Sequence, residues 1–296
     1  MTRLKAELLL FFVATIWAGT FPIVKVSMLT IPPFYFIGIR FLLGAVLFTV
    51  IFFNKLQLKD SNILKAGLVL GFFQMVGFGS QTIGMIYTSA SNSALITGIT
   101  ILIVPFAQFL IIKKPVLFEN WIGVLIVTIG LFLLTQPHLN GINIGDLITL
   151  ICPFAWAFYI IYVDVYTNKY DIETLIFLQL WFVTLVSFAL GFILEDFSLI
   201  NFTANDLLSF LYMGILATFL TTILLNKYQK MTSPIRASII YTWEQPAAVM
   251  FSVIFINEYF NYLQIIGGVL MIGGILFSET FEYIKNYVLK KSAVNK

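Results

Sequence analysis

The sequence has few charged residues, one histidine and one cysteine. Asp, Glu, Lys and Arg make up 10% of the 296 residues, whereas soluble domains carry roughly a quarter. This composition excludes an ordinary soluble domain. The single cysteine, Cys152, excludes an internal disulfide framework. With one cysteine and one histidine, His138, the chain has too few of the usual zinc ligands, and we expect neither a metal nor a cofactor.

Sequence signatures of membrane enzymes are also missing. There is no His-Glu-x-x-His, no Ser–His constellation and no pair of aspartates within the apolar segments. A ring-forming charged motif or filter sequence, as in a channel, is absent as well. We therefore expect no enzymatic activity, and an intramembrane enzyme or a channel-like protein on the same helical scaffold stays the alternative. The net charge of +3 and the pI of 8.8 indicate basic loops, and we expect no nucleic-acid partner.

Apolar residues are what the chain has in abundance. They make up 60% of the sequence, the mean hydropathy is +0.97, and apolar runs of nearly twenty residues recur along almost the whole chain. A helix of about 20 apolar residues crosses the roughly 30 Å hydrocarbon layer of a bilayer. The sequence therefore predicts an all-α integral membrane protein with ten transmembrane helices, at 5–24, 33–53, 64–87, 91–112, 118–135, 146–166, 174–194, 207–228, 235–256 and 262–280.

Lysine and arginine are distributed unevenly between the loops of this arrangement. One side of the membrane carries fifteen of the 17 basic residues, and the other side carries only Lys25 and Arg40. Because basic loops stay in the cytoplasm, we expect a multi-pass protein of the cell (inner) membrane with both termini cytoplasmic. The fifteen are Arg3, Lys5, Lys55, Lys59, Lys65, Lys113, Lys114, Lys169, Lys227, Lys230, Arg236, Lys285, Lys290, Lys291 and Lys296.

The two halves of the chain share residues at a nearly constant spacing. Pairs at an offset of 139 are Glu7 with Asp146, Trp17-Ala18 with Trp156-Ala157, and Val26 with Val165; pairs at an offset of 144 are Thr88-Ser89 with Thr232-Ser233, Gly123 with Gly267, and Gly130 with Gly274. Each half has five expected spans, an odd number, so the second copy must enter the membrane from the opposite side. We expect inverted five-helix repeats at 1–136 and 145–282, a linker at 137–144 and a cytoplasmic basic tail at 283–296. Such repeats place a substrate site between the halves near the middle of the membrane and permit alternating access.

Short motifs in a fixed order then suggest a family. They are Trp17-Ala18-Gly19-Thr20-Phe21 followed by Lys25, Arg40, Gly145-Asp146-Leu147 through Trp156-Ala157-Phe158-Tyr159, and Ser233-Pro234-Ile235-Arg236-Ala237-Ser238 through Glu244, Pro246, Asn257-Glu258 and Gly267. Over nearly its full length the chain resembles the EamA-like permeases of the drug/metabolite transporter superfamily. The resemblance implies a permease or exporter of small metabolites such as amino acids, amines or drugs. It implies a protein without an ATPase domain, driven by a proton or substrate gradient, present as a monomer or homodimer in the lipid bilayer.

Glu244 is the main candidate for a functional residue. It lies near the centre of the expected span 235–256, where an ionisable group costs at least about 2.5 kcal/mol. Glu244 is either a counter-ion for a substrate amine, a proton-coupling carboxyl, or a packing group that pairs with another residue such as Arg40, itself a candidate. Pro246 removes a backbone hydrogen bond and is expected to kink the helix beside this carboxyl.

Six further residues share helix faces that we expect to border the same site. Helical spacing places the glutamines on one face of the third span, the tyrosines one turn from Glu244 or Trp156, and the tryptophans at equivalent positions of the two repeats. The aromatic rings either offer flat faces to a cationic substrate or simply pack. The glutamines either line a cavity or clasp neighbouring helices. These residues are Gln74, Gln81, Trp17, Trp156, Tyr159 and Tyr241.

The charge distribution yields a topology that labelling tests directly. Cysteines introduced at Asn140 and Asn201 should react with a membrane-impermeant reagent from outside the cell, and a cysteine at Lys59 only from the cytoplasm, because basic loops are retained inside. The reverse pattern would reject the charge argument.

Overall fold

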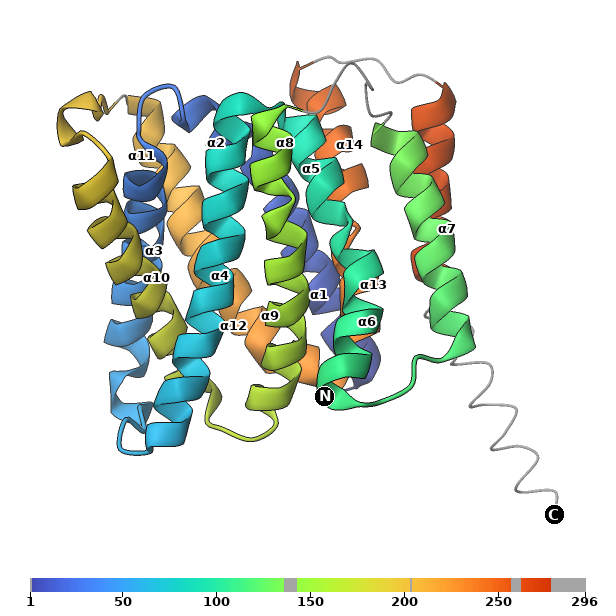
Figure 1. The fold of residues 1–296 in the computed structure, drawn as a ribbon, viewed down its shortest axis with the longest axis horizontal. Coiled ribbons are helices and arrows are strands. Elements are labelled where there is room, and N and C mark those ends of the chain that lie inside the picture. Colours follow the sequence, from blue (N-terminus) through green and yellow to red (C-terminus); the bar gives the residue numbers. More distant parts are fainter. Residues whose placement is uncertain (1, 136–142, 203, 257–261, 278–296) are drawn as a thin grey trace.

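The computed structural model describes residues 2–135, 143–202, 204–256 and 262–277. Within these ranges every regular element is helical, and Figure 1 shows the long helices running roughly side by side. The first half consists of α1 (Arg3–Ala18), α2 (Thr20–Ser27), α3 (Pro33–Phe52), the short η1 (Phe53–Lys55), α4 (Ser61–Tyr87), α5 (Ala90–Gly98), α6 (Thr100–Ile112) and α7 (Phe118–Thr135). The second half consists of α8 (Ile144–Thr149), α9 (Ile151–Thr167), α10 (Ile172–Leu194), η2 (Phe197–Leu199), α11 (Ala204–Leu211), η3 (Tyr212–Leu220), α12 (Thr221–Tyr228), η4 (Gln229–Met231), α13 (Pro234–Tyr241), α14 (Glu244–Ile256) and a last helix, Tyr262–Phe277.

Seven helical segments of the described chain are long and apolar enough to cross a membrane. They are Arg3–Ser27, Pro33–Lys55, Ser61–Tyr87, Asn92–Ile112, Ile144–Thr167, Ile172–Leu194 and Asp206–Met231, and they coincide with seven of the ten expected spans. The expected spans 118–135 and 262–280 fall on the shorter apolar helices Asn120–Leu134 and Tyr262–Phe277, and 235–256 falls on the pair α13 and α14. Residues 257–261 and 278–280 lie outside the described part. The all-helical membrane class is confirmed, and the full number of ten spans stays a prediction.

Much of the outer surface of the bundle is apolar. Phe109, Leu110, Phe192 and Ile193 are between 61% and 76% exposed, whereas polar side chains such as Gln179 and Asn226 are fully buried. This distribution is the reverse of that in soluble proteins, which bury their large apolar side chains. It is the distribution that contact with lipid requires.

Four of the spans are interrupted part-way along their length. The interruptions lie at Gly19 between α1 and α2, at Ile99 between α5 and α6, at Leu150 between α8 and α9, and at Thr242-Trp243 between α13 and α14. At three of them a backbone N–H bonds the carbonyl three residues earlier, as in a 3₁₀ turn: Gly19 to Ile16, Ile99 to Ile96, and Trp243 to Ile240. A 3₁₀ turn within a helix often marks a functional hinge. Figure 1 shows the half-helices stacked end to end across the molecule.

The interruption before α14 lies upstream of the proline that was expected to cause a kink. α13 ends at Tyr241 and α14 begins at Glu244, so Pro246 is the third residue of α14. The first turn of a helix has no intrahelical partners for its N–H groups, and proline is tolerated there. Pro246 therefore follows the break, which lies at Thr242-Trp243.

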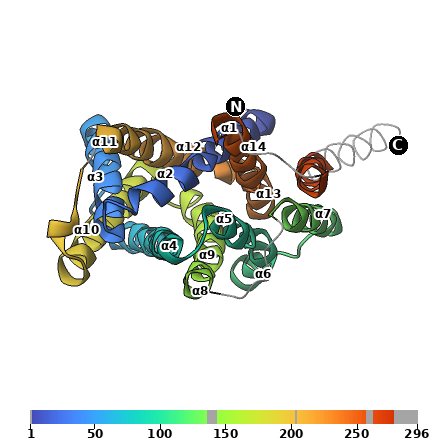
Figure 2. The same cartoon turned by 90° about the horizontal axis from the view of Figure 1, so that it is seen from above.

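Glycines allow two helix pairs to approach backbone to backbone. A Cβ atom on Gly267 would lie 2.6 Å from the carbonyl oxygen of Gly130 and would also meet the backbone nitrogen of Leu134, so α7 packs directly on the last helix. A Cβ atom on Gly145 would lie 2.6 Å from the carbonyl oxygen of Gly84, where α8 crosses the end of α4. Figure 2 shows α7 and the last helix together at one edge of the bundle. Close approach through small residues is how helices pack within membranes.

Replacing Gly267 with alanine should destabilise the protein by about 1–3 kcal/mol, because the added methyl group overpacks the contact with α7. Gly273 lies on the same helix, but no atom of the described part of the chain lies within 4 Å of its Cβ position. Gly273→Ala should therefore be neutral or stabilising, since alanine favours helix by about 0.8–1 kcal/mol over glycine. Thermal unfolding of both variants in the same detergent measures the difference, and equal unfolding temperatures would contradict this packing.

Candidate functional site

A cavity of about 60 Å³ lies at the centre of the bundle, where three of the interrupted spans meet. Trp17 and Thr20 border it on either side of the break at Gly19, and Gly98 and Thr100 border it around Ile99. The third break contributes Thr242, Glu244 and Gln245. The remaining lining residues are Phe78, Gln81, Thr97, Trp156, Ile160, Leu225, Ser238 and Tyr241. Interrupted helices that meet around a central cavity are a recurrent arrangement in secondary transporters.

Among the described residues, Glu244 is the only carboxylate on this lining. It is the first residue of α14, is partly exposed to the cavity, and makes neither an ion pair nor a hydrogen bond with any residue that the structure describes. The positive end of the α14 helix dipole lies beside it and offsets part of the cost of its charge. The carboxylate therefore keeps both oxygens available to a ligand.

Threonine hydroxyls form hydrogen bonds to the backbone at the three breaks that border the cavity. Each donates to the carbonyl oxygen three residues earlier, which supplies a partner to a backbone group at the interrupted part of the helix. The bonds run from Thr20 to Trp17 (2.7 Å), from Thr100 to Thr97 (2.6 Å) and from Thr242 to Ile239 (2.5 Å). Since a hydroxyl has a single hydrogen, these groups can offer the cavity only their lone pairs.

Other polar groups on the lining increase this excess of acceptors. The Ser238 hydroxyl donates to the carbonyl of Ile235 at 2.6 Å, so its hydrogen is also used within the helix. The Gln245 side-chain oxygen is buried and has no hydrogen-bond partner among the described residues. Together with Glu244, these groups form a surface suited to a ligand that carries several N–H donors and a positive charge.

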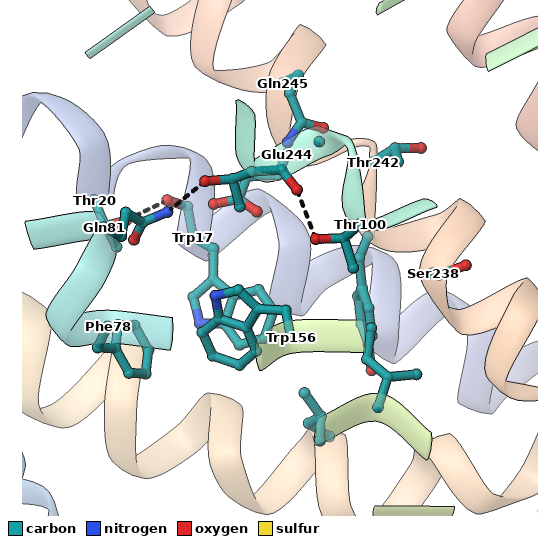
Figure 3. A pocket seen from close by; sticks show the side chains of 15 residues that line it. Trp17, Thr20, Phe78, Gln81, Thr100, Trp156, Ser238, Thr242, Glu244 and Gln245 are labelled. Carbon is teal, nitrogen blue, oxygen red and sulfur yellow. Dashed lines mark hydrogen bonds between the residues drawn. The ribbon is translucent and has the colours of Figure 1, made fainter. Parts of the chain in front are cut away.

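Aromatic rings form another part of the cavity wall. The Trp17 ring centroid lies 5.8 Å from that of Trp156 and 5.7 Å from that of Tyr241, and Phe78 meets Trp156 edge to face at 5.0 Å. Figure 3 shows the two tryptophan rings side by side near Glu244. Aromatic faces attract cations and are worth about 0.5–2 kcal/mol to a bound ammonium group.

The candidate residues from the sequence divide into two groups. Five of them line the cavity: Glu244, Tyr241, Gln81, Trp17 and Trp156. Gln81 donates its amide to the Thr97 hydroxyl at 3.0 Å. The tyrosine hydroxyl of Tyr241 donates to Gln229 at 3.1 Å. Both side chains are thus held in place at the cavity wall.

The other three candidates lie behind the wall. The Arg40 guanidinium donates to the Thr218 hydroxyl at 2.7 Å and to the Ala217 carbonyl at 3.0 Å, and it stacks on Phe78 at 4.4 Å from the ring centroid. It forms no ion pair with Glu244 within the described structure. Tyr159 donates to Gln179 at 2.7 Å, and the Gln74 side chain is buried outside the lining.

Sequence reasoning did not single out Gln245 or the lining threonines. The signal was weak because threonine is common in spans and usually bonds its own helix. Two local patterns coincide with the breaks at Gly19 and Ile99. In Gly19-Thr20 and Gly98-Ile99-Thr100, a glycine near mid-span is followed closely by a threonine.

The chain is similar to known proteins over nearly its full length. The model of the EamA-like transporter family matches the chain twice, at residues 4–136 and 143–280. An uncharacterized transporter of Archaeoglobus fulgidus is 30% identical over 93% of this chain and 85% of its own. A probable amino-acid metabolite efflux pump of Salmonella typhimurium is 25% identical over 92% of this chain and 93% of its own. A solved crystal structure with a TM-score of 0.75 and 15% identity covers 94% of this chain and 98% of that chain, and it shows the same fold.

These relatives are named as transporters and efflux pumps, and the described helices are those of a multi-pass membrane protein. The similarity extends over nearly the whole chain, and the family model covers both halves. The protein is therefore a membrane transporter that belongs to the EamA-like transporter family.

Proposed function

We propose that the protein is a secondary-active permease or exporter that moves small metabolites bearing a protonated amine, such as amino acids or amines, by alternating access and without ATP. The observation that carries this proposal is the cavity itself, in which an unpaired carboxylate, Glu244, is surrounded by oxygen acceptors and aromatic rings. A ligand that supplies hydrogen-bond donors and a positive charge satisfies these groups. An anionic ligand would leave the acceptors without partners, at a cost of about 1–3 kcal/mol for each buried group.

The choice of amine-bearing metabolites has two further supports. An ammonium group donates up to three hydrogen bonds, and charge-assisted bonds to a carboxylate are roughly twice as strong as neutral ones. The name of the Salmonella typhimurium relative, a probable amino-acid metabolite efflux pump, agrees with this substrate class.

A single carboxylate also suggests how transport is coupled to a gradient. Glu244 can hold one positive partner at a time, either a proton or the ammonium group of the substrate. Binding of one therefore displaces the other, which is the requirement for exchange of substrate against protons. This coupling needs no nucleotide and no metal.

The proposed architecture is ten spans arranged as two inverted five-helix repeats, at 1–136 and 145–282, with a linker at 137–144 and a basic tail at 283–296. The breaks at Ile99 and at Thr242-Trp243 support it, because 99 and 243 differ by the same 144 residues that separate Thr88-Ser89 from Thr232-Ser233. In this arrangement the protein works as a monomer or homodimer in the inner membrane, with both termini in the cytoplasm and the cavity between the repeats.

Substituting Glu244 with glutamine should reduce transport at least tenfold, because the uncharged amide can neither release a proton nor attract an ammonium group. The variant should unfold at the same temperature as the parent or a higher one, since it removes a charge within the bundle that has no ion-pair partner among the described residues. Uptake of labelled amino acids and amines into proteoliposomes, driven by a pH gradient, measures the first effect, and thermal unfolding measures the second.

Glu173→Gln is the matched control, because it makes the same change in the first turn of α10, outside the cavity lining. It should leave uptake unchanged. Equal uptake by Glu244→Gln and the parent would overturn the role of this carboxylate. Recovery of a chemically altered substrate from the vesicles would instead support an enzyme.

A further inference from the structure

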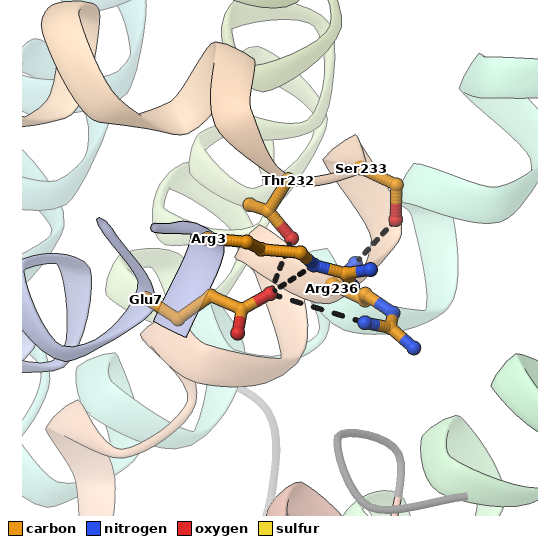
Figure 4. Close-up of polar contacts among 5 residues, drawn as sticks. All are labelled: Arg3, Glu7, Thr232, Ser233 and Arg236. Atoms are coloured by element: carbon orange, nitrogen blue, oxygen red, sulfur yellow. Dashed lines mark hydrogen bonds and ion pairs between the residues drawn. The ribbon is translucent and has the colours of Figure 1, made fainter. Parts of the chain in front are cut away.

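At the N-terminal end of the bundle, a buried carboxylate ties the first span to the segment that leads into α13. Glu7 in α1 accepts a hydrogen bond from the Thr232 hydroxyl at 2.9 Å and another from the Arg3 guanidinium at 2.7 Å. The Arg236 guanidinium lies 3.9 Å from the same oxygen. Figure 4 shows these groups converging on Glu7. We refer to the contact between Glu7 and Thr232 as the Glu7 latch.

At the opposite end of the bundle, a second carboxylate makes the corresponding contact. Asp146 in α8 accepts a hydrogen bond from the Thr88 hydroxyl at 2.5 Å, and we refer to this contact as the Asp146 latch. The Lys25 ammonium group donates to the carbonyl oxygens of Met85 and Thr88 at 2.6 and 2.8 Å. Figure 1 places the start of α8 at the end of the molecule far from the N-terminus.

The two latches are copies of one contact. Glu7 and Asp146 are related by the offset of 139, and Thr88 and Thr232 by the offset of 144. The backbone angles of the two threonines agree: φ is −119° and ψ is 169° at Thr88, against −129° and 179° at Thr232. Each threonine is followed by a serine whose hydroxyl caps the next helix, Ser89 on α5 and Ser233 on α13. Each latch therefore joins the first span of one half to the start of a half-helix in the other.

Each latched half-helix leads directly to the cavity. α5 begins beside Thr88 and ends at Gly98, and α13 begins beside Thr232 and ends at Tyr241, and both terminal residues line the cavity. The Tyr241 hydroxyl also bonds Gln229, three residues before Thr232, so the cavity wall and the Glu7 latch share one connected segment. Movement of either half-helix away from the first span it contacts would open the cavity towards one end.

We propose that the Glu7 latch and the Asp146 latch are the two gates of the transport cycle, each closing the cavity towards one side of the membrane. Release of the Glu7 latch exposes the cavity to the N-terminal side, and release of the Asp146 latch exposes it to the opposite side. This inference rests on the proposed alternating access, and it assigns Glu7, Thr232, Asp146 and Thr88 a role in gating that is separate from substrate binding by Glu244.

Side-specific labelling of a cysteine in the cavity tests the gates without any substrate. The parent for this experiment carries Cys152→Ala and Ser238→Cys, since Ser238 lines the cavity. A membrane-impermeant maleimide is applied to membrane vesicles of known orientation, so that each face is probed separately. Glu7→Gln leaves a neutral amide acceptor, and Thr232→Val removes the donor. Both should raise the labelling rate roughly tenfold from the N-terminal side only, which is the change expected on weakening or losing one hydrogen bond to a charged group. Asp146→Asn and Thr88→Val should do so from the opposite side only.

Asp171→Asn is the matched control. The Asp171 carboxylate also accepts a threonine hydroxyl, from Thr174 at 2.7 Å, but the bond lies within the first turn of α10, and the hydroxyl itself accepts the Gln57 backbone N–H and contacts no half-helix of the described chain. Asparagine caps a helix as well as aspartate does, so this variant should fold and should label like the parent. The threonine variants keep both carboxylates, so they test the latch even where a carboxylate variant does not fold.

The outcomes separate the gates from the proposed function. Side-specific increases in labelling support the gates even if no amine or amino acid is transported, because accessibility is read without a substrate. Labelling that is unchanged, or that rises equally from both sides in folded variants, overturns the gates while leaving the effect of Glu244→Gln on uptake intact. The same shift in Asp171→Asn would also overturn them.

Discussion

The interruption of helices inside a bilayer is the constraint on which this architecture depends. Hydrocarbon offers no hydrogen-bond partner, so a backbone carbonyl at a break in a helix must find one within the protein. Around the cavity the chain uses a threonine three residues further on, at Thr20, Thr100 and Thr242. These bonds have a chemical consequence, because a hydroxyl that has given its hydrogen to the backbone presents only lone pairs to the cavity. The bonds that permit the breaks therefore also determine which ligands the cavity can satisfy.

The charge of Glu244 depends on the same interruption. In a continuous helix the residue would lie mid-span, away from either end of the helix dipole. The break at Thr242-Trp243 makes it the first residue of α14 instead, where a negative charge is favoured by about 0.3–1 kcal/mol or more. One break thus opens space for a ligand, supplies a threonine acceptor and makes the carboxylate less costly to bury.

Part of the cavity lining could be predicted from the sequence, because a polar residue within an apolar span is expected to face the protein interior and not lipid. Glu244 and Gln81 were expected to face either a cavity or a protein partner because lipid cannot solvate them, and both border the cavity. Gln74, expected on the same helix face as Gln81, lies outside the lining. The same argument could not show that Arg40, which is also ionisable and mid-span, lies outside the cavity lining. Its partners, Thr218 and Ala217, lie 178 and 177 residues away, and only the packing of α3 against η3 brings them within reach. The sequence also did not show that the break lies before Pro246, because proline is compatible with a first helical turn.

The equivalent breaks at Ile99 and Thr242-Trp243 have a consequence for how such a protein can diverge. The residue that follows the break is Thr100 in the first half and Glu244 in the second, so two matching positions of one scaffold hold a neutral hydroxyl and a carboxylate. Both side chains reach the same cavity, and both stand at the N-terminus of a half-helix. The two matching positions thus provide two sites for one charge. Under the proposed function, substitution at either site would change the charge selectivity of the cavity, and at Thr100 it would also remove the hydroxyl that bonds the Thr97 carbonyl.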